Sequence, residues 1–436
     1  MLEGIPAIVR VLMVFVLVLI AIRKNLSLGN AFLLGAIALG FIFGLRPLAM
    51  VRSILTSVAY TKTLSLAMIV SLILVLSHSM ELAGQLQRLV SSFRGLVRTP
   101  RLNIIVFPAL IGLLPMPGGA VFSAPMVKTL GSRLELSGTE LSYINYWFRH
   151  IWEYWWPLYP GVLLTITLAE LDLSIFVLFL CPLTVVAWYA GYLPLKGLKD
   201  VGDGATSNLM GENRPPLGPF LKELTPILIT ICLGLGLGTV ISLAVQSGSL
   251  VGTVAKEIGL ISALLIAIVW VWHRNRLSAA QRWQAFTNRE LLRLVYMVMA
   301  ILAFKGILED SRAVQSISQE LLHWHVPLMP ITVVLPFLVG SVVGVTIGFV
   351  GTTFPILIAL IKSFSESQFM LGYMMLGLTS GFAGVLFSPL HICLLLSNQY
   401  FGATLGGVYR YLWLPGISLV FIAIGYFWIL HFINPF

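Results

Sequence analysis

Charged residues are scarce in this sequence. Only 10% of the 436 residues are Asp, Glu, Lys or Arg, whereas 58% are hydrophobic. Soluble globular domains carry about 25% charged residues, so this composition excludes a water-soluble globular fold. Apolar runs of about twenty residues, the length that crosses a hydrocarbon core, recur along the chain. The sequence therefore predicts an all-α polytopic membrane protein.

Acidic residues and cysteines are the other shortages. Lys and Arg outnumber Asp and Glu by 27 to 17, which gives a formal net charge of +10. These cations fall mainly in loops on one predicted side of the membrane, so the positive-inside rule explains them and no nucleic-acid partner is expected. The three cysteines, Cys181, Cys232 and Cys393, lie in separate apolar stretches without metal-ligand spacing. We expect them to be packing residues.

The apolar runs divide the chain into two halves. Spans are expected near 5–22, 28–46, 63–80, 146–169 and 173–195, and again near 221–246, 252–272, 291–308, 370–397 and 411–432. The predicted organisation is a first repeat over 1–198, a cytoplasmic linker over 199–220 and a second repeat over 221–436. The first run ends at Arg23-Lys24 without a small-residue cleavage site, so it is expected to be a retained helix.

The two halves share a sequence register. An offset of 228 positions gives eleven identities across residues 60–112. The matches include polar residues, glycine and proline: Glu81 with Glu309, Gln87 with Gln315, Pro108 with Pro336, and Gly112 with Gly340. Each half is expected to cross the membrane an odd number of times, so the second half is predicted to be inverted. Inverted repeats with broken helices are typical of secondary transporters.

Each half also contains an apolar region broken by glycine and proline. The first, near 103–128, contains PMPGGAVFSAP, and the second, near 331–361, contains GSVVGVTIGFVGTTFP. Each arm is too short for a core that needs about twenty residues, so each region is predicted to be a re-entrant hairpin. Backbone exposed at a tip must face protein or a watery cavity. We expect both tips to meet near mid-membrane and form a binding site.

The basic residues predict the orientation. Placing the loops richest in Lys and Arg in the cytoplasm puts the N- and C-termini outside. The first hairpin then enters from the cytoplasm and the second from outside. A prokaryotic cytoplasmic (inner) membrane is the expected location, with membrane lipids as partners.

Hydroxyl groups are expected beside both hairpin breaks. Ser123 precedes Pro125 in the first hairpin, and Thr352 and Thr353 precede Pro355 in the second. Hydroxyls and exposed carbonyls suit a sodium ion, so these three hydroxyl residues are predicted to bind one. No other metal and no cofactor is predicted, with Na⁺ or H⁺ as the coupling ion. The alternative is that the small residues only allow close helix packing.

A second polar cluster lies in the sequence RHIWEYWWPLYP. Arg149, His150 and Glu153 are ionisable residues at predicted membrane depth, where such groups are costly and indicate function. Arg149 is predicted to bind a substrate carboxylate, and His150 or Glu153 to handle protons. Alternatively, Arg149 and Glu153, four residues apart, form a structural salt bridge on one helix face.

The corresponding segment of the second half reads SPLHICLLLSNQYFG. Ser388 and His391 are predicted to join the substrate site, although His391 could instead be a satisfied core residue. The remaining predicted substrate residues lie in the hairpins: Pro117, Gly118, Gly119, Gly351 and Thr352.

Three other polar or aromatic groups receive simpler interpretations. Lys305 and Glu309 are expected to form a surface pair at a helix end. His323 and His325 flank Trp324 and are expected to anchor an interface rather than bind metal. The tryptophans of RHIWEYWWPLYP either line a cavity or pack.

PMPGGAVFSAP, RHIWEYWWPLYP and SPLHICLLLSNQYFG, with the repeated halves, resemble the ion transporter superfamily. Within it, the chain is most similar to an uncharacterised membrane family, domain-of-unknown-function family 401. The resemblance implies a scaffold domain, a moving transport domain with both hairpins, elevator-like alternating access and a homodimer. Relatives include carriers for dicarboxylates, citrate, gluconate and arsenite, and sodium/proton exchangers. Many dicarboxylate carriers have Ser-Asn-Thr at both tips, where this chain has Pro117-Gly118-Gly119 and Gly351-Thr352-Thr353.

The predicted function is secondary active transport of a small organic anion, coupled to sodium or protons, and not enzymatic catalysis. The alternatives are a membrane-embedded enzyme that uses His150 and Glu153, a sodium/proton antiporter, and a channel. No HExxH, GxSxG or paired intramembrane Asp motif supports the enzyme.

Overall fold

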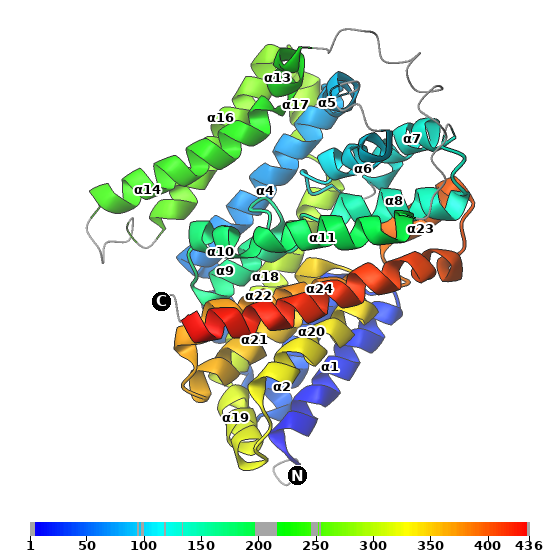
Figure 1. Ribbon diagram of the computed structural model, residues 1–436. Helices are drawn as coiled ribbons and strands as arrows, with labels where there is room; N and C mark the ends of the chain where they lie inside the picture. Colours follow the sequence, from blue (N-terminus) through cyan, green and yellow to red (C-terminus); the bar gives the residue numbers. More distant parts are fainter. Residues whose placement is uncertain are drawn as a thin grey trace.

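The computed structural model describes residues 5–93, 96, 100–116, 119–132, 134–196, 216–245, 252 and 254–433. Within these residues the chain is helical and contains no strand (Figure 1). Most of the predicted linker, and the hairpin residues Pro117 and Gly118, lie outside the described residues. An all-helical fold was expected from the apolar runs, and it is confirmed.

The helices of the first half follow the expected order, with several short additions. They are α1 (Ala7–Arg23), α2 (Leu28–Ile42), α3 (Pro47–Ala59), α4 (Thr61–Leu82), α5 (Gln85–Phe93), α6 (Pro100–Ile111), α7 (Ala120–Gly131), α8 (Gly138–His150), α9 (Pro160–Ala169), α10 (Leu173–Leu180), α11 (Pro182–Tyr192) and the 3-10 turn η1 (Leu193–Leu195). Proline occupies the first position of α3, α9 and α11, where its missing N–H costs no helical hydrogen bond.

The second half has a similar series of helices. They are α13 (Leu217–Leu228), the π turn η2 (Ile229–Leu233), α14 (Gly234–Ala244), α16 (Ala255–Arg274), α17 (Ala279–Phe286), α18 (Arg289–Asp310), α19 (Ala313–His323), α20 (Leu328–Val343), α21 (Thr346–Ser363), the 3-10 turn η3 (Ser367–Phe369), α22 (Met370–Leu386), α23 (Ile392–Phe401) and α24 (Leu405–Ile433). Four helices were not expected from the sequence: α3, α5, α17 and α19. All four are shorter than a membrane crossing, so a search for long apolar runs misses them.

Eight helical stretches within the described residues are long and apolar enough to cross a membrane. They are Thr61–Leu82, Leu173–Leu195, Leu217–Ala244, Ala255–Arg274, Ala279–Asp310, Thr346–Ser363, Ser367–Leu386 and Leu405–Ile433. Large apolar side chains project from their surfaces, including Leu243 on α14 and Phe432 on α24, which are 83% and 81% exposed. Apolar surface of this kind is stable in lipid and fits an integral membrane protein.

Corresponding helices of the two halves match in length and packing. Helices α4 and α18 both have 22 residues and begin at Thr61 and Arg289, while α9 and α23 both have 10 residues and begin at Pro160 and Ile392. The contacts between the halves are reciprocal. Helix α4 packs on α16 and α18 on α2, while α7 packs on α23 and α21 on α9.

The two arms of each broken apolar region pack against each other. Helix α6 contacts α7, and α20 contacts α21 (Figure 1). The break in the second region lies earlier than the sequence suggested. Helix α20 ends at Val343, Gly344 has a φ of 69° and Val345 is extended, so α21 begins at Thr346. Gly351, Thr352 and Thr353 therefore lie inside α21 and do not form the tip. The prediction that each arm is too short to cross a membrane is wrong for α21, whose 18 residues are long and apolar enough.

Candidate functional site

Four interruptions of helices meet in the interior of the fold. Two lie between the arms of the hairpins, between α6 and α7 and between α20 and α21. The other two divide the apolar runs predicted near 146–169 and 370–397. The first run is split into α8 and α9 by residues 151–159, and the second into α22 and α23 by residues 387–391.

Glycines bring these interruptions into backbone contact. A Cβ on Gly112 would collide with the carbonyl oxygen of Arg149, and a Cβ on Gly340 would collide with that of Gly381. At the tip of the second hairpin, a Cβ on Gly344 would lie 2.8 Å from Ser388 Oγ. The hairpins and the broken helices are therefore packed with no room for an added side chain, as expected where glycine allows close backbone approach.

Arg149, in the last turn of α8, is buried, with only 2% of its surface exposed. Its Nη2 donates to the carbonyl of Met116, at 2.8 Å, in the break of the first hairpin. Its Nη1 lies 3.4 Å from Cys393 Sγ and 3.4 Å from His150 Nε2. Among the described residues no carboxylate pairs with this guanidinium, and its buried Nε has no hydrogen-bond partner. Gly119, a predicted site residue, packs directly against it.

Glu153 faces the other hairpin. Because α8 ends at His150, Glu153 lies in a turn, and the alternative of a salt bridge with Arg149 on one helix face does not form. Thr346 Oγ1, at the first position of α21, instead donates to Glu153 Oε2 at 3.0 Å, and Glu153 Oε1 lies 3.7 Å from His150 Nε2. The end of α8 thus places a cation at one hairpin break, and the turn after it places a carboxylate at the other.

His150 and His391 lie between these two charges. Their ring centroids are 4.7 Å apart, and the Tyr146 ring contacts both. The His150 Nδ1 is 2.5 Å from the Tyr146 carbonyl, and the His391 Nδ1 is 3.4 Å from the Val385 carbonyl. A carbonyl only accepts, so both Nδ1 atoms carry the proton and donate. His391, which could have been an isolated core residue, belongs to this cluster.

Cys393 is a member of the cluster that the sequence interpretation missed. It is buried at the start of α23, two residues after His391. The His-x-Cys spacing beside a helix break was the available signal. Cysteine count and separation alone pointed to a packing residue, because neither reveals what lies beside the thiol.

The aromatic residues after Arg149 fasten the first hairpin. Trp152 Nε1 donates to the carbonyl of Ala109 at 2.7 Å, and Trp156 Nε1 to that of Leu113 at 3.0 Å. Tyr159 Oη donates to the carbonyl of Gly112 at 2.6 Å. The last carbonyls of a helix lack partners within it. These side chains supply partners at the end of α6 and hold the break in position.

Ser123 lies in a separate buried network. Its hydroxyl donates to Asn145 Oδ1 at 2.6 Å, and Asn145 Nδ2 donates to Ser397 Oγ at 2.9 Å. The network joins α7, α8 and α23, and Asn145 was not singled out from the sequence. Thr352 and Thr353 instead donate to carbonyls of their own helix. No hydrogen bond within the described residues links either threonine to Ser123.

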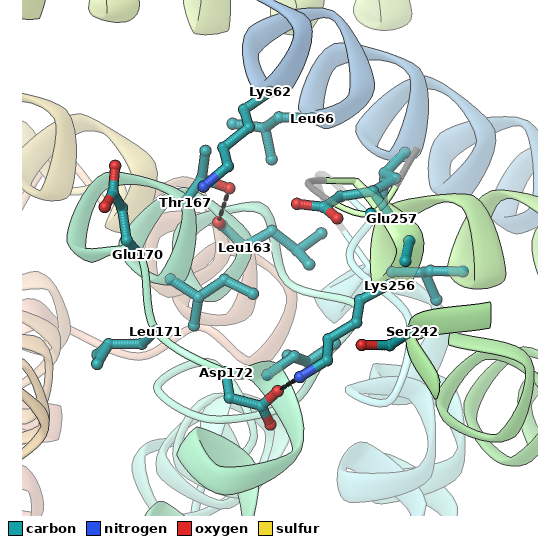
Figure 2. Close-up of a pocket in the computed structure, with 16 residues that line it drawn as sticks. Lys62, Leu66, Leu163, Thr167, Glu170, Leu171, Asp172, Ser242, Lys256 and Glu257 are labelled. Atoms are coloured by element: carbon teal, nitrogen blue, oxygen red, sulfur yellow. Dashed lines mark hydrogen bonds and ion pairs between the residues drawn. The ribbon is translucent and has the colours of Figure 1, made fainter. Parts of the chain in front are cut away.

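Two polar cavities lie at the far end of α9, about 15 Å from its first residue at 1.5 Å per residue. One has a volume of about 350 Å³ and is shown in Figure 2, where Lys62 and Glu170 are among the lining residues and Lys256 pairs with Asp172. The other, of about 400 Å³, shares Lys62 and Glu170 and is also lined by Lys362 of α21. Helices α9 and α21 pack together, so both lead from the broken segments toward these cavities.

The fold and the site define a polytopic helical membrane protein with a buried polar cluster between broken helices. The family model described as "Protein of unknown function (DUF401)" matches residues 7–429. The chain therefore belongs to this family, as its hairpin motifs suggested. No curated protein matches the chain.

Proposed function

We propose that this protein is a secondary active transporter of a small organic anion. The observation that carries the proposal is Arg149, a permanent cation buried without a carboxylate partner among the described residues. Burying an unpaired charge costs several kcal/mol. We therefore take the unpaired Arg149 to mark a site at which a bound anion supplies the missing partner. A carboxylate would accept from the unpartnered Nε and offset the charge.

The proposed architecture is a pair of inverted repeats, each with one re-entrant hairpin. Support comes from the reciprocal packing of equivalent helices and from the matched glycine contacts, Gly112 on Arg149 and Gly340 on Gly381. A two-fold relation within the membrane plane produces exchanged contacts of this kind. The proposal includes elevator-like movement of the hairpins with the broken helices, a homodimer, and both termini outside.

The two polar cavities fit an aqueous route to this site from one membrane face. Their lining contains lysines and carboxylates in similar number, and Lys256 is paired with Asp172, so the cavities offer polar groups along the route but no excess of positive charge. The route would end at Thr346 and Glu153, on the opposite side of the cluster from Met116.

Glu153 determines which ion is coupled. Its carboxylate contacts Thr346 and lies near His150, so an entering anion meets a negative charge unless Glu153 binds a proton. Coupling to protons would use this residue. Coupling to sodium would use the oxygen atoms around Ser123 and Asn145, which converge in the first hairpin.

The test is anion exchange in proteoliposomes with Arg149→Gln and, as a matched control, Arg410→Gln. Arg410 is an exposed arginine on α24. We expect Arg149→Gln to lower exchange of dicarboxylates or other small organic anions at least about tenfold, which corresponds to about 1.4 kcal/mol, and Arg410→Gln to leave it unchanged. Normal exchange by a folded Arg149→Gln protein would refute the role of Arg149.

A further inference from the structure

We propose that His150, His391 and Cys393 form a binding site for a divalent transition-metal ion of the zinc class. One ligand atom from each residue lies within 4.8 Å of the others, and all three residues are buried. Imidazole nitrogen and thiolate sulfur are the ligands that Zn²⁺ prefers. The site does not depend on the transport of an anion, because it is defined by these three side chains alone.

The histidine tautomers favour metal binding. Nδ1 of His150 and Nδ1 of His391 both donate to backbone carbonyls, at 2.5 and 3.4 Å. This leaves Nε2 of each ring with a lone pair. Metal-binding histidines generally donate their other ring N–H to a carbonyl or carboxylate, which holds the ring in orientation. Both rings of this cluster already have that arrangement.

The distances require only a small contraction. Metal–nitrogen bonds of about 2.0–2.1 Å and metal–sulfur bonds of about 2.3 Å place tetrahedral ligand atoms about 3.5 Å apart. Atoms now within 4.8 Å of one another would have to move by about 1 Å, which side-chain rotation near the helix ends can supply. Glu153 Oε1, 3.7 Å from His150 Nε2, is positioned to be the fourth ligand.

Arg149 competes with the metal in this geometry. Its Nη1 lies 3.4 Å from Cys393 Sγ and 3.4 Å from His150 Nε2, the same atoms that the metal would use. A bound cation would therefore displace the guanidinium. The thiolate and Glu153 would neutralise the two metal charges, and the displaced Arg149 would remain as a free cation.

Co²⁺ is a suitable probe, because a cobalt–thiolate bond gives a charge-transfer absorption that oxygen and nitrogen ligands do not. Titration of the purified full-length protein should give this band at one ion per chain, and Zn²⁺ should abolish it by competition. Cys393→Ser should lose the band, whereas Cys181→Ser and Cys232→Ser should retain it. Those two cysteines lie outside the cluster.

Two further variants test the assignment independently of Cys393. His391→Gln should weaken Co²⁺ binding by more than about tenfold, and it provides the test if Cys393→Ser does not fold. Arg149→Gln should bind Co²⁺ more tightly than the wild type, because a competitor is removed, whereas a purely structural arginine would leave the affinity unchanged or lower it.

The proposal is overturned if the wild-type protein gives no thiolate band, or if the band persists in Cys393→Ser. Binding that is equal in wild type and His391→Gln would also overturn it and indicate adventitious metal only. Anion exchange measured with a metal chelator both inside and outside the proteoliposomes separates the metal-site proposal from the transport proposal. Loss of metal binding with intact exchange would refute only the metal site, and the reverse result only the transport.

Discussion

The two broken helices occupy corresponding places in the two halves but carry different chemistry. Helices α8 and α22 begin at Gly138 and Met370, and α9 and α23 at Pro160 and Ile392, so both pairs differ by 232 positions. At that offset the corresponding residues are Arg149 with Gly381, His150 with Phe382, Glu153 with Val385, Tyr159 with His391, and Gly161 with Cys393. The charges come only from the first half, while the second contributes one imidazole and a thiol.

The two halves therefore share an arrangement of the backbone, but they do not carry equivalent binding residues. Both halves use a glycine, Gly112 or Gly340, to bring a hairpin against the carbonyl of a broken helix. The polar side chains then converge on one asymmetric cluster. A single cluster contacts both hairpin breaks, through Met116 and Thr346. The following changes test where the correspondence holds and where it fails.

The largest effect is expected at the matched glycines. In Gly112→Ala and Gly340→Ala the new methyl group overlaps a backbone carbonyl that cannot move by itself. Each should lower the free energy of unfolding by about 1–3 kcal/mol, to a similar extent in both halves. Thermal unfolding in detergent measures this, with Gly425→Ala as the control, since nothing lies within 4 Å of its added Cβ. A loss of stability in only one of the two variants would show that the two glycine contacts are not equivalent.

A smaller effect is expected at the network of the first hairpin. Ser123→Ala leaves the buried Asn145 Oδ1 without a donor, which should cost about 1–2 kcal/mol and reduce stabilisation by Na⁺. Thr353→Val removes a hydroxyl that bonds only to its own helix, so the loss should be below about 1 kcal/mol. Thermal unfolding with Na⁺ and with choline separates the two contributions. Equal Na⁺ responses in both variants and the wild type would exclude Ser123 and Thr353 as ligands.

Glu153→Gln should change pH dependence and preserve exchange. The amide still contacts Thr346 but cannot take up a proton. Net uptake driven by a proton gradient should therefore be lost, whereas anion-for-anion exchange should persist and vary less than about tenfold with pH.

His150 Nε2 lies 3.7 Å from Glu153 Oε1, and the other titratable or charged groups around this residue are Arg149, His391, Cys393, Tyr146 and Tyr159. Unchanged pH dependence would assign proton handling to one of the histidines. Val385→Ala, at the corresponding position, is the control.

The smallest effect is expected at Lys305 and Glu309. Their charged atoms are 3.6 Å apart, and Glu309 is 59% exposed, so solvent screens the pair. Lys305→Gln should change the free energy of unfolding by less than about 0.5 kcal/mol. A loss of stability above about 1 kcal/mol would contradict this expectation and show that the Lys305–Glu309 pair stabilises the end of α18 despite its exposure.

Sequence reasoning located several members of the cluster but not its composition. Arg149, His150, Glu153 and His391 were identified, because ionisable residues stand out in apolar sequence. Cys393 was missed, since nothing local distinguishes a cysteine that faces such a cluster. Thr346 was noted only as a hydroxyl residue of the second hairpin and was not assigned to the site. The position of the second break was also wrong. Gly344 is left-handed and Val345 is extended, so the chain breaks there and α21 begins at Thr346. Gly351 lies inside α21, where it packs against Ile301.

The sequence by itself determined the class of protein, the long helices and the existence of the breaks. These depend on local properties: apolar length, and the effects of glycine and proline on the backbone. Only the tertiary structure decided which polar groups meet. Arg149 and Cys393 are 244 residues apart, and Glu153 reaches a threonine 193 residues away. Such contacts arise from the packing of helices from both halves, which side-chain identity along a single segment does not encode.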